Sequence, residues 1–396
     1  MKKGFFLVLL LFSISISGCW DATDLQDVQY ITALGVDFDE DNEEYVIYAQ
    51  SIDFGQLSVN QEGTSQAESG AWVAKARGET ILMALENFSS RSNQMLHWGH
   101  VTVIVYSMNA LEHEEIIEIN EGLYRFQQVR TTPWVFGTTE SLEELLLVTN
   151  MFGDTVHTVL FNPDSVYKER SFVEPITLHQ LMRTYAEKGR SVVLPKIDIS
   201  KKELKDNNGK KKDAVHSNGA VLLKGGKAPT TFSDLQLAGI RWLDYHTENT
   251  PLQIEEDGKT IAALNIIRPK NVIQSEVNNG EVFFDIDLDI HASLLDFPPD
   301  ETLGASRTID EILELMKEMI EKQIRDTYEL GLEHGKDVYS LENHFYRSNV
   351  RAYNKLNQSI QLTKESLRTI TIHPVIEHTG EYEFYRDRVP KSRQEQ

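Results

Sequence analysis

Cysteine is nearly absent from this chain, which has one, Cys19, among 396 residues. A single cysteine excludes an intramolecular disulfide bond, so the fold must rest on its hydrophobic cores alone. Long apolar runs are missing too. After the first 18 residues, no apolar stretch approaches the roughly 18 to 20 residues that a membrane-spanning helix requires. We therefore expect no membrane segment in the body of the chain.

Basic residues are in short supply. The 39 lysines and arginines stand against 61 aspartates and glutamates, which gives a formal net charge of −22. A surplus of negative charge opposes binding to nucleic acid and to anionic lipid surfaces, so we expect no nucleic-acid partner. A chain of this length and ordinary apolar content favours two or three globular domains.

Recognisable catalytic patterns are absent as well. The sequence has no G-x-S-x-G elbow, no H-E-x-x-H motif, no Walker loop and no G-x-G-x-x-G turn after a strand. Its 12 histidines do not cluster at the spacing of metal ligands. The sequence therefore predicts a protein without catalytic residues, a cofactor or a metal site.

The one cysteine follows a short leader. Two lysines precede an apolar stretch over residues 5–16, which is the pattern of a signal peptide and is too short to span a bilayer. Residues 16–19, Ile-Ser-Gly-Cys, resemble a bacterial lipobox. We therefore expect cleavage between Gly18 and Cys19 and a lipid on the Cys19 thiol. Two acyl chains such as palmitate would then give stable attachment to the outer face of a membrane. The alternative is an ordinary signal peptide with an incidental cysteine.

Hydrophobic periodicity predicts mixed secondary structure before residue 200. Strands are expected at 30–36, 45–52, 101–106, 131–136 and 192–199, and helices at 75–91, 112–124, 176–187 and behind a capping box at 141–144. Pro195 interrupts the last of these strands. Because proline cannot donate to a strand ladder, we expect that strand at the edge of a sheet.

An acidic turn follows the first strand. Asp37, Asp39 and Asp41 alternate like the start of a calcium loop. However, Asn42 and Tyr48 stand where such a loop needs glycine and glutamate, so a solvated hairpin tip is the better interpretation.

His97 and His100 are three residues apart, a spacing that can hold a metal on a helix. Gly99 between them favours a turn instead, and no acidic third ligand stands at a regular spacing. We expect a packed, structural His100 at the start of a strand.

A lysine-rich segment divides the chain. Residues 201–213 contain six lysines and have no apolar face, which is typical of an interdomain linker or a long exposed hairpin loop. Behind a signal peptide at 1–18, we expect an N-terminal region at 19–200 with one or two domains, a C-terminal domain at 214–380 and a charged tail at 381–396.

Beyond this segment, strands are expected at 219–224, 261–268, 282–290 and 369–373, and helices at 235–243, 309–330 and 341–356. In the strand at 282–290, apolar residues alternate with Asp285, Asp287 and Asp289. These carboxylates form either a cation or acid–base site or, as the alternation favours, the solvated face of a half-buried antiparallel strand. The helix at 309–330 would be about 33 Å long, and its apolar stripe either packs on a sheet, as we favour, or binds a partner.

Several short motifs occur along the chain in a recognisable order. They are Gly18-Cys19-Trp20-Asp21, Ala33-Leu34-Gly35-Val36-Asp37, Gly78, Gly99-His100, Arg125, Arg130, Leu194-Pro195, Gly219-Ala-Val-Leu-Leu-Lys224, Leu235 through Gly239 to Trp242-Leu243, and Gln323 with Asp326 and Leu330-Gly331. This combination resembles the Ger(x)C family, the lipoprotein C subunits of GerA-type spore germinant receptors. The chain departs from the family pattern at Asp24, where glutamate is usual, and has no tryptophan after Trp242.

The resemblance implies an α+β fold of three mixed α/β domains, with largely antiparallel sheets and a long amphipathic helix in the C-terminal domain. It also implies a non-catalytic subunit that assembles with integral membrane A and B subunits in the inner membrane of a spore. The motif residues would then be structural: Trp20, Asp21, Gly35, Asp37, Gly78, Gly99, His100, Pro195, Gly219, Asp326 and Gly331. Two other classes stay open, a solute-binding lipoprotein that captures the germinant and a lipid-anchored cell-wall hydrolase.

Overall fold

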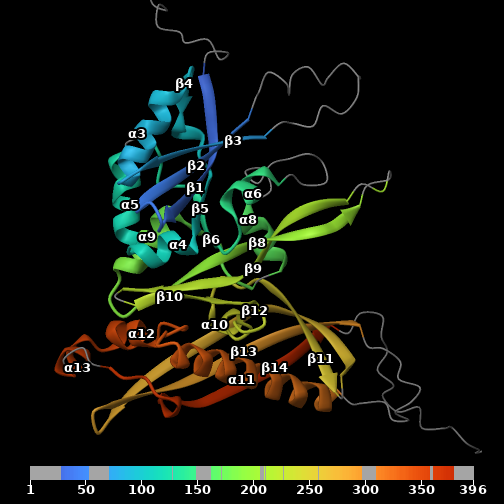
Figure 1. Ribbon diagram of the computed structural model, residues 1–396. Coiled ribbons are helices and arrows are strands. Elements are labelled where there is room, and N and C mark those ends of the chain that lie inside the picture. The colour runs from blue at the N-terminus through green and yellow to red at the C-terminus, as the bar shows by residue number, and fades with distance from the viewer. Residues whose placement is uncertain are drawn as a thin grey trace, which may run out of the picture.

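A computed structural model of the chain contains two β-sheets, one beneath the other, with helices packed on each (Figure 1). It describes residues 28–52, 71–126, 128–148, 162–170, 172–205, 209, 211–225, 227–256, 258–296, 309–356 and 360–378. The predicted cleavage and lipid site, Gly18 and Cys19, lies outside these residues, as do the motif residues Trp20 and Asp21. Within the described ranges, no helix combines the length and apolar character needed to cross a membrane.

The first sheet has ten strands within the described residues, in the order β10-β9-β8-β6-β5-β1-β2-β3, with β4 beside β1 and β7 beside β6. Their bounds are β1 Val28–Asp39, β2 Glu44–Ile52, β3 Ala71–Gly78, β4 Met95–His97, β5 Val103–Ser107, β6 Trp134–Thr138, β7 Ile176–Thr177, β8 Val192–Lys205, β9 Lys211–Lys224 and β10 Lys227–Phe232. The central strands β1, β5 and β6 run parallel, and both ends of the sheet are antiparallel. A single residue pair, Gly137 with Lys196, joins β6 to β8.

Helices cover both faces of the centre of this sheet (Figure 1). They are α3 Ile81–Arg91, α4 Met108–His113, α5 Ile116–Arg125 and α9 Leu178–Ala186 on one face and α6 Leu142–Leu147 on the other, while α8 Pro163–Glu169 lies closer to the second sheet. In β1, Leu34 and Val36 pack toward the first group and Ala33 packs toward α6. Residues 31–36 are all buried as a result, which is why this strand does not alternate apolar and charged residues.

The second sheet has the order β11-β12-β13-β14. Its strands are β11 Asn249–Glu256, β12 Lys259–Asn278, β13 Glu281–Asp296 and β14 Leu367–His378, and its helices are α10 Ile240–Leu243, α11 Ile309–Glu333, α12 Leu341–Ser348 and α13 Val350–Lys355. One face is covered by α11, through Ile312, Met316, Ile320 and Ile324. The predicted alternation in β13 is confirmed, because its apolar residues are buried against α11 while Asp285, Asp287 and Asp289 lie on the opposite face.

The predicted fold class is confirmed. The described chain is α+β, most of its strand pairs are antiparallel, and its long amphipathic helix packs on the second sheet as the apolar stripe required. The number of domains and their limits stay predictions.

Two helix predictions in the first half of the chain were wrong. The helix expected from residue 75 begins only at Ile81, because Thr80 caps it by accepting a hydrogen bond from the Met83 N–H at 3.2 Å. Residues 71–78 pair with β2 as strand β3 instead. The helix expected at 112–124 is two helices, α4 and α5, and the first is capped by Ser107.

Pro195 is not in an edge strand. Strand β8 lies between β9 and β6, but its register shifts between Pro195 and Ile197, and among the described residues its ladder pairing with β6 is limited to Lys196. A bulge beside an almost unpaired flank accommodates a residue that has no N–H to donate.

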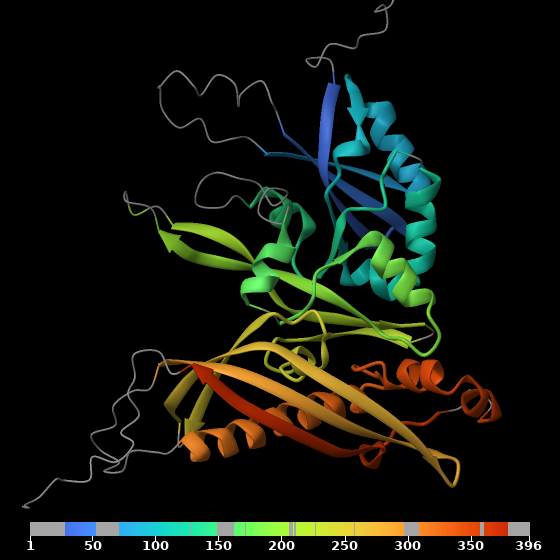
Figure 2. The ribbon, with the colours of Figure 1, turned by 180° about the vertical axis from the view of Figure 1, so that it is seen from behind.

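Residues 201–205 and 211–213 of the lysine-rich segment lie in a β-hairpin. Strands β8 and β9 pair as far as Lys205 and Lys211, and in both views this hairpin extends beyond the body of the sheet (Figure 1, Figure 2). Strands β9 and β10 therefore belong to the first sheet, although they follow the segment in the sequence.

Candidate functional site at the junction of the two sheets

A hydrophobic cluster lies where the two sheets meet, and we call it the junction core. Its members are Val173, Ala220, Leu222, Phe232, Leu237, Ile240 and Val338, with Leu330 and Tyr339 packed against them. They come from β9, β10, α10, the end of α11 and the neighbouring loops. The junction core therefore joins strands of the first sheet to the long helix of the second.

The turn before α10 brings Gly239 directly against α11. A Cβ atom at this position would lie 2.5 Å from the Gln323 carbonyl oxygen and would also overlap the Tyr339 hydroxyl, so only glycine permits the approach. The Gly239 N–H donates to the Thr327 hydroxyl at 3.0 Å, and that hydroxyl donates to the Gln236 carbonyl at 2.9 Å. The backbone of the turn is thus fixed to one face of α11.

Arg241 and Trp242 of α10 share one acceptor, the side-chain oxygen of Gln323 in α11. The distances are 3.2 Å from Arg241 Nη2 and 2.9 Å from Trp242 Nε1. Arg241 also donates to two oxygens of β11, at 2.9 and 3.1 Å. Burial lowers the pKa of Arg241 to about 10, so its guanidinium is charged at neutral pH and depends on these acceptors. The motifs at 235–243 and 323–331 are therefore tied to each other.

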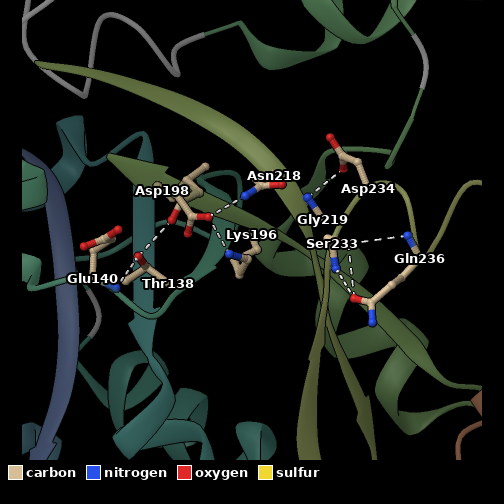
Figure 3. Close-up of polar contacts among 10 residues, drawn as sticks. Thr138, Glu140, Lys196, Asp198, Asn218, Gly219, Ser233, Asp234 and Gln236 are labelled. Atoms are coloured by element: carbon tan, nitrogen blue, oxygen red, sulfur yellow. Dashed lines mark hydrogen bonds and ion pairs between the residues drawn. The ribbon is translucent and has the colours of Figure 1, made fainter. Parts of the chain in front are cut away.

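Gly219 of β9 packs against the segment that leads from β10 to α10. Its φ is +83°, and a Cβ atom there would lie 2.8 Å from Ser233 Cα. Its N–H donates to Asp234 Oδ1 at 2.6 Å (Figure 3). Burial raises the pKa of Asp234. Ser233 and Gln236 close the turn reciprocally, with the Ser233 N–H donating to Gln236 Oε1 at 2.9 Å and the Gln236 N–H donating to Ser233 Oγ at 3.4 Å.

A polar cluster stands where β6 pairs with β8 (Figure 3). Asp198 Oδ2 accepts from Lys196 Nζ at 2.5 Å and from Asn218 Nδ2 at 2.8 Å, and Thr138 Oγ1 donates to the Ile197 carbonyl at 2.8 Å. Asp198 Oδ1 is buried and has no hydrogen-bond partner among the described residues. Side-chain bonds here replace the ladder that the bulged strand lacks.

Two charged residues, Lys336 and Asp337, are buried in the loop between α11 and α12. Lys336 Nζ donates to the Ala228 carbonyl of β10, and burial lowers its pKa to about 8. Asp337 Oδ2 accepts from the Glu342 N–H at 2.8 Å at the start of α12, and burial raises its pKa to about 6. Both charges are held at an energetic cost, since burial favours the neutral form.

Helix α12 adds a second line of contacts to the first sheet. Lys224 Nζ of β9 lies 2.8 Å from Glu342 Oε2, and the Ser191 N–H donates to Ser340 Oγ at 3.2 Å. Asn343 Nδ2 donates to the carbonyl of residue 188 at 2.8 Å. The junction is therefore bridged by ion pairs and hydrogen bonds as well as by its apolar core.

The other motif residues of the first half lie within or beside the first sheet. Gly35 is in β1 and Gly78 ends β3, while Gly99 lies in a 3₁₀ turn, Trp98–His100. Asp37 Oδ1 accepts from the Ser107 hydroxyl and, at 2.9 Å, from the Phe38 N–H, so it links β1 to the start of α4 and is not part of a calcium loop.

His100 is exposed rather than packed in a core. It ends the 3₁₀ turn, and its ring centroid lies 4.9 Å from that of Tyr30. The prediction that His100 begins a strand was wrong, because the strand begins three residues later, at Val103.

In the second half, Asp326 is exposed on α11 and the Gly331 carbonyl accepts from the Lys336 N–H at 2.8 Å. Sequence reasoning missed three residues of the junction: Arg241, Lys336 and Asp337. Arg241 carried a usable signal, because it stands alone among apolar residues beside Trp242. Nothing local marks the other two as buried.

An open pocket of about 200 Å³ lies between α4, α5 and β9–β10. This is below the roughly 300 to 1,000 Å³ that small-molecule sites occupy. Two of its charged groups already have partners: Lys227 Nζ donates to the Gly335 carbonyl at 2.6 Å, and Glu115 accepts from the Tyr185 hydroxyl at 2.9 Å.

Comparison with known proteins places nearly the whole chain. Residues 21–199 match the family described as spore germination protein N-terminal domain, and residues 217–380 match spore germination B3/GerAC like, C-terminal. The boundary between the two matches falls within the β8–β9 hairpin.

Two curated relatives come from Bacillus subtilis strain 168. Spore germination protein KC is 21% identical over 373 residues, which is 91% of each chain, and putative spore germination protein YfkR is 23% identical over 241 residues, 59% of each. The crystal structure of the GerBC protein covers 87% of this chain and 96% of its own, with a TM-score of 0.48 and 13% identity. With both family domains present in order, the chain belongs to the Ger(x)C family of spore germination proteins.

Proposed function

We propose that this protein is the lipid-anchored, non-catalytic C subunit of a spore nutrient germinant receptor. In this role it acts by assembling with integral membrane A and B subunits on the outer face of the spore inner membrane. The observation that carries the proposal is the consecutive match of both germination-protein domains over residues 21–199 and 217–380.

The placement of the motif residues supports a scaffold. Gly219, Gly239 and Gln323 make backbone and side-chain contacts that hold two sheets together, and none of them lines the one pocket described above. When the motif residues of a subunit maintain its fold, its exposed surface is left to contact partners. Confinement to a membrane by a lipid would raise the effective concentration of those partners, so weak contacts suffice for assembly.

The anchor is tested on Cys19. Mass spectrometry of the protein extracted from membranes should find a diacylglycerol-modified N-terminal Cys19, and Cys19→Ala should release the protein from the membrane fraction. An unmodified thiol at Cys19 would contradict the anchor without affecting the family assignment.

The assembly is tested in spores. Crosslinking mass spectrometry on spore membranes should recover links between this chain and two integral membrane proteins. Deleting the gene should abolish the response to one class of nutrients and spare the others. If deletion spores respond normally to every nutrient, the receptor assignment is wrong. If the isolated chain binds one amino acid or sugar with micromolar affinity in calorimetry, it is a solute-binding lipoprotein instead.

A further inference from the structure

Three side chains with metal-ligating atoms meet beside the junction core. Glu174 lies in the link between α8 and β7, and Asp244 and His246 follow α10. One ligand atom from each lies within 4.8 Å of the other two. His246 Nδ1 is 2.7 Å from Glu174 Oε1 and 3.8 Å from Asp244 Oδ1. The group therefore brings together residues about 70 positions apart.

The two carboxylates are packed in an environment that favours a cation. The side chains of Glu174 and Asp244 are 30% and 13% exposed. Two carboxylates that share a partly buried site repel each other, and a divalent ion removes that repulsion.

Contacts from outside the group and within it hold the Asp244 carboxylate in place. Asp244 Oδ2 accepts from the Tyr167 hydroxyl at 2.8 Å, and Asp244 Oδ1 accepts from the His246 N–H at 2.9 Å. The Arg241 guanidinium lies 4.9 Å from the centre of the Phe172 ring, which docks the Glu174 segment against α10. Outer hydrogen bonds that orient a ligating carboxylate, as Tyr167 does here, are characteristic of built metal sites.

We propose that Glu174, Asp244 and His246 form a binding site for a divalent transition-metal ion of the zinc type. One imidazole nitrogen and two carboxylate oxygens suit zinc, whereas calcium and magnesium prefer oxygen ligands alone. Ligands around a tetrahedral zinc stand roughly 3.3 Å apart, and the present separations bracket that value. The ion would link the α8–β7 segment to the segment after α10, and water would complete its coordination.

The experiment is a zinc titration of the full chain, purified in detergent and treated with a chelator. Calorimetry should show saturable binding of one zinc ion per chain in the micromolar range or tighter, and zinc should raise the midpoint of thermal unfolding. Glu174→Gln and His246→Ala should each remove this binding. Tyr167→Phe keeps all three ligands and should weaken binding about tenfold, because it removes only the bond that orients Asp244.

A matched control lies elsewhere in the chain. Asp287, Asp289 and His373 also bring ligand atoms within 4.8 Å of one another, but all three are exposed, so His373→Ala should leave the binding unchanged. Glu174→Gln relieves a repulsion and should fold without metal as well as the original protein, which circular dichroism verifies. The proposal is overturned if the original protein shows no saturable zinc binding, if Glu174→Gln binds equally well, or if His373→Ala abolishes the binding.

Discussion

Replacing Asp337 by asparagine should make the stability of the protein less dependent on pH. The carboxyl group is buried, and its pKa is raised from 3.8 to about 6. Each factor of ten in proton affinity corresponds to about 1.4 kcal/mol, so ionising Asp337 in the folded state costs about 3 kcal/mol relative to the unfolded chain.

The sign follows from proton binding. The folded protein binds this proton more tightly than the unfolded chain does, so the contribution of Asp337 to stability is complete below pH 3.8 and is lost as the pH rises through 6. Asparagine has no such loss. Its side-chain oxygen can accept from the Glu342 N–H in place of the carboxylate, but its buried amide group costs about 1–2 kcal/mol if poorly paired. We therefore expect the variant to be about 1–2 kcal/mol more stable at pH 7 and less stable near pH 4.

Urea unfolding of both proteins between pH 4 and 8, followed by tryptophan fluorescence, measures this difference. Asp326→Asn, at an exposed position of α11, is the matched control and should change the free energy of unfolding by less than about 0.5 kcal/mol at every pH. A stability difference for Asp337→Asn that does not vary with pH would refute the reasoning.

Three further results are expected. Gly239→Ala should lower the free energy of unfolding by about 1–3 kcal/mol, because its Cβ would overlap α11, whereas Gly225→Ala, where the nearest heavy atom is 3.7 Å away, should not; equal thermal shifts would contradict this. Gln323→Leu should cost about 2–3 kcal/mol and change the emission of Trp242, which loses its acceptor; unchanged emission would argue against that bond. Trypsin should cut first at the end of the β8–β9 hairpin, and the two fragments should still elute together in gel filtration because β9 stays paired with β8; separation of the fragments would contradict the sheet order.

The elements that the sequence predicted well are those whose pattern is local. The alternation in β13 and the apolar stripe of α11 each require only neighbouring residues, and the helix predicted at 309–330 was found at 309–333. Strand β3 was misread because residues 75–77, Lys-Ala-Arg, favour a helix by their own propensity. They form a strand because β2 offers them a partner.

The contacts at the junction could not be predicted from neighbouring residues, for a different reason. Arg241 and Gln323 are 82 residues apart, and neither shows in the sequence that it is the other's partner. The resemblance to a family marked Gly219, Asp326 and Gly331 as residues of interest, but it did not indicate that Gly219 contacts the turn before α10. The three metal-ligating residues were also missed, since Glu174 stands about 70 positions before its partners.

The placement of β9 and β10 in the first sheet has a practical consequence for dividing this protein. The N-terminal family match ends at residue 199 and the C-terminal match begins at residue 217. These limits suggest expressing each half alone. A protein ending at residue 199 would leave β8 as a bare edge, and long unpaired edges promote aggregation. A chimera between two relatives should therefore keep residues 192–232 with the N-terminal half and cross over just after Phe232, where the chain leaves the first sheet.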